Sequence, residues 1–286
     1  MIAPPKPADR LSRLLKHYAL QFGERLARAG SLYESHGHIE CNEFGISTAS
    51  EAGGRRNNQD ASLIWIPQQP SPVRWAAAIS DGVRTSIQSE HGSQLACYAA
   101  LTVLLQSYQQ EKEPNAQPIE QCLKYFSKLG TKVGEYADHL RPEMLSKGNW
   151  KRVLRDGRFA QTTLMVAWED DRGLTIEGIG DGGYILNIDG PSLSYLPSSD
   201  GPVNCLSPSG VCLRRDFRIE VQHWESLALF TDGVTPAVSM EGLIVPTNAA
   251  KEENLASSTL DNYLSVYPHL IDDNVTLLTA ARRHQQ

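Results

Sequence analysis

Most of the chain consists of short apolar runs that Gly, Pro, Asn and Asp separate, and this texture limits the fold more than any other feature. Runs of this kind, rich in β-branched residues, are typical of strands. The predicted strands are 62–66, 74–80, 162–168, 174–179, 183–188, 226–231 and 275–280.

A long stretch with helical periodicity, residues 93–140, lies between the second and third predicted strands. Its apolar side chains recur every three or four residues, which is the spacing of a helix face. Pro114 and Pro118 divide it into two helices, because proline in a helix interior removes a backbone donor and clashes with the preceding turn. Strands, two helices and strands again predict a layered α+β domain rather than alternating β-α units.

The spacing of apolar residues near the N-terminus predicts one amphipathic helix over residues 9–31, with Leu11, Leu15 and Leu26 on its apolar face. The polar face is basic and carries Arg10, Arg13, Lys16, Arg25 and Arg28. We assign residues 1–40 to an N-terminal amphipathic helical extension and residues 41–286 to the main domain. The helix either packs on its own domain, the commoner arrangement, or presents its basic face to a membrane surface or a partner.

Composition excludes several classes of protein. A net charge of −6 and a pI near 5.8 argue against nucleic-acid binding, because nucleic-acid-binding proteins normally have a basic surface. Five cysteines without a C-x-x-C spacing predict neither a disulfide framework nor a zinc site, and they fit a reducing cytoplasm. The sequence shows no signal peptide and no apolar run long enough to span a bilayer, so we expect no membrane insertion. We expect a cytoplasmic monomer.

Aspartates recur at the ends of the apolar runs. Asp81, Asp181 and Asp232 each follow such a run and precede a glycine, which allows the backbone to approach a ligand closely. A single Asp-Gly after a strand is more often a hairpin turn than a metal ligand. Several of them, together with Asp60 and Asp273, favour a site for magnesium or manganese, which bind carboxylate and carbonyl oxygens.

Six short motifs follow one another in a recognisable order. They are R-x-x-N-Q-D at 55–60, D-G at 81–82, T-T-L at 162–164, G-D at 180–181, T-D-G at 231–233 and D-N at 273–274. In this order they resemble the metal-dependent protein phosphatases, the type 2C serine/threonine phosphatases, over about residues 50–280. The resemblance implies a β-sandwich of two antiparallel sheets flanked by paired α-helices, in four layers α-β-β-α, with the metals at one end.

The resemblance also implies a set of metal ligands. Asp81 would bridge two Mg or Mn ions, and the Gly82 carbonyl would complete one site. Asp232 and Asp273 would bind the second ion, and Asp60 would hold a water molecule bound to the metal. Asp181 matches the position that, with Asp232, supports a third and weaker metal in some bacterial members.

Arginine suits phosphate because its planar guanidinium donates two parallel hydrogen bonds. Arg55 matches the arginine that grips the substrate phosphate, and Arg56 is the alternative. After Gly82 the chain has Val-Arg-Thr where many members have x-G-G, so Arg84 either adds a phosphate contact or is solvated.

The spacing after this turn resembles a divergent bacterial branch through Ser89, Gly92 and Ser93. His91 is either a proton donor for the leaving group or a surface or capping residue near the start of a helix. Gln59 replaces an acid of the common motif, which predicts weaker metal affinity, although the divergent branch commonly has this glutamine.

Two bound cations lower the pKa of a water molecule and stabilise charge during in-line displacement, so no covalent nucleophile is required. The sequence contains neither a C-x5-R cradle nor a G-x-S-x-G elbow. The resemblance implies hydrolysis of phosphoserine and phosphothreonine in proteins, opposing a bacterial Ser/Thr kinase. Two alternatives stay open: a catalytically weak domain that binds a phosphorylated partner, and an unrelated metal hydrolase acting on small phosphate esters or nucleotides.

Overall fold

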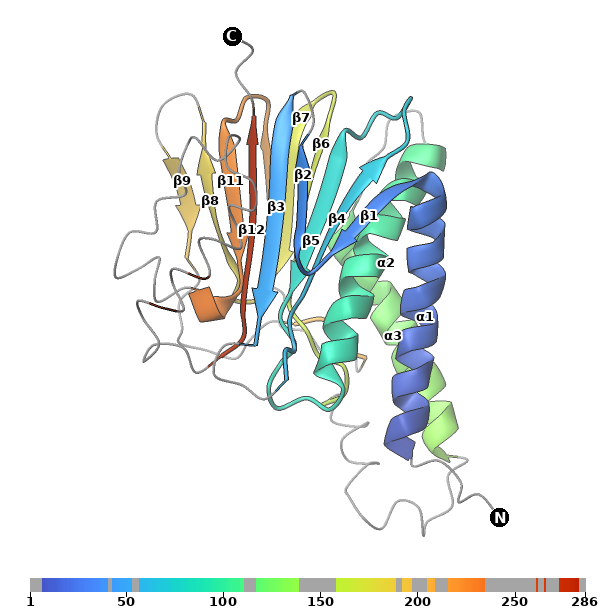
Figure 1. Ribbon diagram of the computed structural model, residues 1–286. Helices are drawn as coiled ribbons and strands as arrows, with labels where there is room; N and C mark the ends of the chain where they lie inside the picture. The colour runs from blue at the N-terminus through green and yellow to red at the C-terminus, as the bar shows by residue number, and fades with distance from the viewer. Residues whose placement is uncertain are drawn as a thin grey trace.

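The computed structural model describes residues 7–40, 43–52, 57–110, 117–138, 158–188, 192–196, 205–208, 216–234, 261, 265 and 273–282. These residues form two six-stranded sheets that face each other, with three helices covering one of them (Figure 1). The predicted α+β sandwich of two antiparallel sheets is confirmed. The part of the four-layer prediction that places helices on the other sheet lies outside the described residues.

All hydrogen-bonded neighbours in both sheets are antiparallel. The first sheet has the order β1 (Gly30–Glu34), β4 (Ala61–Pro67), β5 (Trp75–Ser80), β6 (Leu164–Asp170), β7 (Gly173–Ile179) and β10 (Asp216–Val221). The second has the order β2 (Gly37–Glu40), β3 (Phe44–Glu51), β12 (Val275–Arg282), β11 (Ser226–Phe230), β8 (Gly183–Asn187) and β9 (Ser192–Tyr195). Each strand that the sequence predicts is present.

Strand β5 shows why the first sheet is buried on both faces. Trp75 and Ile79 belong to the core between the two sheets, together with Leu229 of β11. Ala76 and Ala78, which alternate with them, belong to the core under the helices. Successive side chains of a strand point to opposite faces, so a strand covered on both sides is apolar throughout. The small alanines leave room for a helix to approach the sheet.

The helical layer consists of α1 (Pro7–Ala29), α2 (Ser89–Gln110) and α3 (Pro118–Asp138). Pro118 is the first residue of α3, where the missing backbone N–H costs nothing. Within the described residues, no helix combines the length and the apolar character that a bilayer crossing requires.

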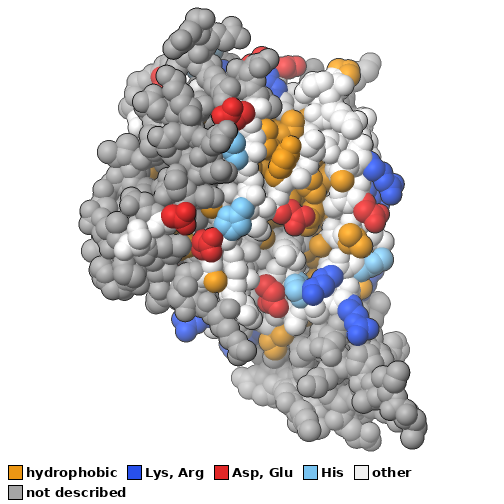
Figure 2. Space-filling model, in the orientation of Figure 1, with side chains coloured by type: hydrophobic (Ala, Val, Ile, Leu, Met, Phe, Trp, Pro, Cys, Tyr) orange, Lys and Arg blue, Asp and Glu red, His pale blue; other side chains and the backbone are white. Residues whose placement is uncertain are grey.

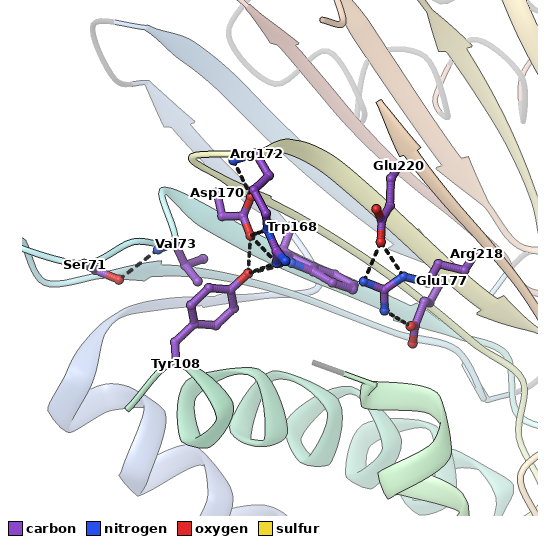
Figure 3. Close-up of polar contacts among 9 residues, drawn as sticks. All are labelled: Ser71, Val73, Tyr108, Trp168, Asp170, Arg172, Glu177, Arg218 and Glu220. Carbon is purple, nitrogen blue, oxygen red and sulfur yellow. Dashed lines mark hydrogen bonds and ion pairs between the residues drawn. The ribbon is translucent and has the colours of Figure 1, made fainter. Parts of the chain in front are cut away.

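Buried polar contacts fasten the end of α2 to the first sheet (Figure 3). The Tyr108 hydroxyl of α2 donates to the Asp170 carboxylate and accepts from the Trp168 indole, with an Nε1 to Oη distance of 3.1 Å. Arg172 Nη2 lies 2.8 Å from the same carboxylate. A carboxylate that is almost fully buried is thus satisfied by a cation and a hydroxyl, as burial requires.

A second set of polar contacts fastens α3 to the first sheet, next to the contacts of α2. Glu177 of β7 accepts from the backbone N–H of Ile119 at 3.3 Å and from Arg218 Nη1 at 2.5 Å. The Arg218 guanidinium also lies 5.4 Å from the centre of the Trp168 ring. The negative charge of Glu177 sits at the N-terminus of α3, where it complements the helix dipole.

Helix α1 is part of the core. Its side chains Leu11, Leu15 and Leu26 are buried in the core under the helices. Trp65 Nε1 of β4 donates to the Leu26 carbonyl at 3.1 Å. The prediction that this helix packs on its own domain is confirmed.

The assignment of residues 30–40 to a helical extension is wrong, because they form β1 and β2, which pair with β4 and β3. Whether residues 1–40 fold separately from residues 41–286 stays a prediction.

We expect Leu15→Ala to lower the free energy of unfolding by about 2–5 kcal/mol, because it leaves a cavity between α1 and the sheet. Leu20→Ala is the matched control, since Leu20 lies on the same helix and is 61% exposed. Its effect should stay within about 0.5 kcal/mol. Denaturant unfolding followed by circular dichroism measures both, and equal small effects would contradict a core role for α1.

Candidate metal centre

Five aspartates from distant parts of the chain meet at one end of the sandwich. The positions follow from the antiparallel pairing, which brings the start of one strand beside the end of its neighbour. Ala61 at the start of β4 pairs with Ser80 at the end of β5, and Gly183 at the start of β8 pairs with Phe230 at the end of β11. The aspartates adjoin these strand ends and the start of β12: Asp60, Asp81, Asp181, Asp232 and Asp273.

Three of the carboxylates are close enough to share one ion. One oxygen each of Asp81, Asp181 and Asp232 lies within 4.8 Å of the others. The Oδ1 atoms of these three residues and of Asp60 are buried and have no hydrogen-bond partner. Buried carboxylate oxygens without donors are costly unless a cation compensates them. This donor set fits a hard divalent cation.

The raised pKa values of the carboxyl groups also indicate a site that a cation would stabilise. Burial raises the pKa of Asp81 well above its usual value, and the charges of Asp60, Asp232 and Asp181 raise it further. Burial and the charges of Asp181, Asp273 and Asp60 raise the pKa of Asp232 to about 7. Like charges in a poorly solvated site disfavour ionisation, so these groups hold protons more tightly than free carboxyls do.

Asp60 is held by hydroxyl groups on one side only. Its Oδ2 accepts from Thr231 Oγ1 at 2.9 Å and from Thr276 Oγ1 at 2.8 Å. Thr276 Oγ1 also lies 2.7 Å from Ser50 Oγ, which accepts from Asn58 Nδ2 at 2.8 Å. The four polar groups join β3, β11 and β12 to the loop before β4. They fix Asp60 in orientation while its Oδ1 stays without a hydrogen bond.

The T-T-L motif holds the backbone of Asp81. The Asp81 N–H donates to Thr163 Oγ1 at 3.0 Å, and its carbonyl accepts from the Thr163 N–H at 2.8 Å and from Thr162 Oγ1 at 2.7 Å. A Cβ atom on Gly82 would lie 2.6 Å from the Gln59 carbonyl oxygen. Glycine is therefore required where the loops carrying Asp60 and Asp81 cross.

The D-N motif ties the remaining loops together. A Cβ atom on Gly233, next to Asp232, would lie 2.0 Å from the Asn274 carbonyl oxygen. In the orientation that satisfies both its oxygen and its nitrogen, the Asn274 amide accepts from the Gln59 N–H at 2.8 Å and donates to the Ala52 carbonyl at 3.0 Å. Asp273 thus begins a segment that is bound to both neighbouring loops.

The predicted phosphate-binding residues are placed less completely. Arg55 and Arg56 lie outside the described residues. Arg84 is exposed in the turn that follows Gly82.

Two further residues that the sequence singled out, Gln59 and His91, lie at or against the start of α2. Gln59 Nε2 donates to Ser89 Oγ at 2.8 Å, so this amide braces the start of α2. His91 is partly buried in the first turn of α2, and its Nε2 lies 4.0 Å from Glu90 Oε1. Burial lowers its pKa, Glu90 opposes this shift, and Lys16 of α1 adds to it.

The sequence model of the protein phosphatase 2C family matches residues 49–266. The chain belongs to the protein phosphatase 2C family. No curated protein sequence is significantly similar to it.

Solved phosphatase structures share the fold of this phosphatase 2C member. A serine-threonine phosphatase 2C from Toxoplasma gondii is 12% identical with a TM-score of 0.59, covering 89% of this chain and 100% of its own. The phosphatase Stp1 from Staphylococcus aureus is 15% identical with a TM-score of 0.55, covering 87% and 98%. The catalytic domain of the phosphatase PstP, in complex with two manganese ions, is 17% identical with a TM-score of 0.51, covering 85% and 99%.

Sequence reasoning identified no role for the hydroxyl groups that hold Asp60. Thr231 precedes the Asp-Gly motif and Thr276 lies two residues after Asn274, so both belong to recognisable motifs. Ser50 had no such signal, because it lies in a strand that the sequence did not predict. The contact becomes visible only when β3, β11 and β12 are aligned.

We expect Thr276→Val to lower the free energy of unfolding of this phosphatase 2C member by about 1–3 kcal/mol, because Asp60 and Ser50 lose a buried partner. Thr276→Ser keeps the hydroxyl and should retain most of that stability. Denaturant unfolding of the wild type and both variants measures the difference. Equal losses in both variants would show that the methyl group matters rather than the hydrogen bond.

Metal binding should depend on pH, because carboxylates bind cations only when ionised. Raised pKa values mean that the folded state holds more protons than the unfolded state, so the metal-free protein loses stability as pH rises towards and past about 7. Manganese should therefore raise the unfolding temperature more at about pH 8.5 than at about pH 5.5. Thermal unfolding with manganese and with chelator tests this, and a pH-independent effect of manganese would contradict it.

Proposed function

We propose that this chain is a metal-dependent protein phosphatase that hydrolyses phosphoserine and phosphothreonine in proteins. The observation that carries the proposal is the convergence of Asp81, Asp181 and Asp232, whose oxygens lie within 4.8 Å of one another, in a member of the protein phosphatase 2C family. Their buried, unpartnered oxygens are what a divalent cation needs.

The ligands are proposed to hold two magnesium or manganese ions. Asp81 would contribute to both ions and the Gly82 carbonyl to one of them, and Asp232 and Asp273 would hold the second ion. Asp181 would support a third. When bound, such ions lower the pKa of water and neutralise charge that develops on the phosphoryl group.

The remaining residues would position the reactants. Asp60 offers its free Oδ1 to the attacking water, because Thr231 and Thr276 occupy its other oxygen. Arg55, with Arg56 as the alternative, would bind the phosphate oxygens. The exposed Arg84 is a further candidate for that contact.

The setting of the enzyme is also part of the proposal. We place it in the cytoplasm as a monomer that opposes a Ser/Thr kinase. The acidic net charge and the absence of a membrane-spanning helix among the described residues are compatible with this placement.

Phosphate release from a phosphothreonine peptide tests the proposal directly. We expect release with manganese or magnesium and none with chelator. Asp81→Asn and Asp232→Asn should each reduce it by about a hundredfold or more, since losing even an outer partner of a metal ligand costs 10- to 100-fold. Asp171→Asn is the matched control, because Asp171 is exposed in the turn between β6 and β7.

The other outcomes separate the alternatives. Retained activity in both site variants would refute the metal assignment. Binding of the phosphopeptide without release would favour a phosphopeptide-binding domain. Much faster hydrolysis of a nucleotide or sugar phosphate than of any phosphopeptide would favour a hydrolase of small phosphate esters.

A further inference from the structure

The outer face of α1 carries exposed basic side chains in its first half. Lys16 and His17 lie three and four residues after Arg13, and Leu20 lies four and three residues after them, so the four side chains are neighbours on the helix surface. All four are exposed, and Leu20 is 61% exposed. Figure 2 shows Lys, Arg and His side chains along the side of the molecule where Figure 1 places α1. We call these four residues the α1 basic face.

This face contrasts in charge with the rest of the chain. The helix side chains that the structure describes include more Lys and Arg than Glu: Arg13, Lys16, Arg25, Arg28, Lys124, Lys128 and Lys132 against Glu24, Glu90 and Glu120. The whole chain has a net charge of −6. Arg28 pairs with Glu24 at 3.6 Å. Among the described side chains, none forms a salt bridge with Arg13 or Lys16.

The α1 basic face lies towards the metal centre. Ser89 at the start of α2 accepts from Gln59, the neighbour of Asp60. Gly82 packs against Ser89 so closely that a Cβ atom would lie 2.9 Å from it. Lys16 acts electrostatically on His91 in the same first turn of α2. The start of α2 thus lies between the metal loops and Lys16 of the α1 basic face.

The apolar stripe of α1 decides which partner fits. Leu11, Leu15 and Leu26 are buried in the core, which leaves Leu20 as the one large apolar side chain exposed on the described part of this helix. A helix that binds a bilayer inserts a continuous apolar face, and α1 has none to spare. An extended acidic peptide needs only exposed cations and one apolar contact.

We propose that the α1 basic face docks an acidic segment of the phosphoprotein substrate, with an apolar side chain of that segment on Leu20. The inference rests on the proposed function and adds to it a substrate class: proteins with acidic residues outside the phosphorylated site. Charges of opposite sign on the two surfaces would also speed encounter.

Binding of an unphosphorylated peptide tests docking without any catalysis. The probe is a fluorescein-labelled peptide with several glutamates around one leucine, and its counterpart has glutamine at every glutamate. We expect the wild type to bind the acidic peptide more tightly, with an affinity that falls as salt rises. Arg13→Glu with Lys16→Glu should weaken binding by about twofold to thirtyfold, the range for two exposed ion pairs. Fluorescence anisotropy measures both effects.

Kinetics then connects docking to turnover. The substrates share one phosphothreonine peptide. The acidic sequence or its glutamine counterpart is attached at the N-terminus in one pair of substrates and at the C-terminus in another. The wild type should show a higher kcat/KM for an acidic extension, through KM, and the double variant should lose this preference. Release from p-nitrophenyl phosphate, which has no extension and whose leaving group departs without a proton donor, should be unchanged in the double variant. If no substrate releases phosphate, the proposed function fails, while the anisotropy result still decides docking.

The matched control is Arg25→Glu with Arg28→Glu, which changes the net charge equally on the half of α1 farther from α2's first turn. It should retain the preference for the acidic peptide. Equal losses in both double variants, or no preference in the wild type, would overturn the proposal. Binding of the wild type to vesicles of phosphatidylglycerol with phosphatidylcholine, without binding of the acidic peptide, would overturn it in favour of a membrane surface.

Discussion

The structure depends on keeping several buried carboxylates close together against their mutual repulsion. Asp81, Asp181 and Asp232 bring their oxygens within 4.8 Å, at a place where burial already disfavours charge. Such a cluster persists only if the backbone beneath it cannot relax. The ends of strands in two facing sheets supply that rigidity, because each strand is bound to its neighbours along its length. The sandwich can therefore be understood as the support that this acidic end requires.

Side chains between the loops complete the support. Thr162 and Thr163 hold the backbone at Asp81, and Thr231 and Thr276 hold the side chain of Asp60. Hydroxyl groups suit this task because they donate to a carboxylate without adding a charge that would compete with a cation. As a result, one oxygen of Asp60 is held by two hydroxyl groups, and the other is buried without a hydrogen-bond partner.

The sequence predicted the parts of the fold with strong local signals. The run WAAAIS before Asp81 is apolar because β5 is buried on both faces, and the Asp-Gly pairs mark where such strands end. Strand β3 was missed because its sequence, FGISTASE, is buried mainly through small and polar side chains that pair across the sheet. Strands β9 and β10 are edge strands with polar residues, and edges carry weak patterns. The aspartates were predictable as turn residues, whereas the hydroxyls around Asp60 were not, since threonine in a strand is ordinary.

Helix α1 has two different sides. One side packs in the core, and the other is exposed to solvent. Leu15 and Leu26 lie in the core with α2 and the first sheet, so changes there act on the stability of the whole domain. Arg13, Lys16 and Leu20 are exposed on the other side, so we expect changes there to leave the fold intact. A helix fixed by its inner face presents its outer face without further ordering, which lowers the entropic cost of binding a flexible segment. The acidic cluster and helix α1 therefore belong to the same sandwich domain, because the buried leucines of α1 lie in one core with α2 and the first sheet.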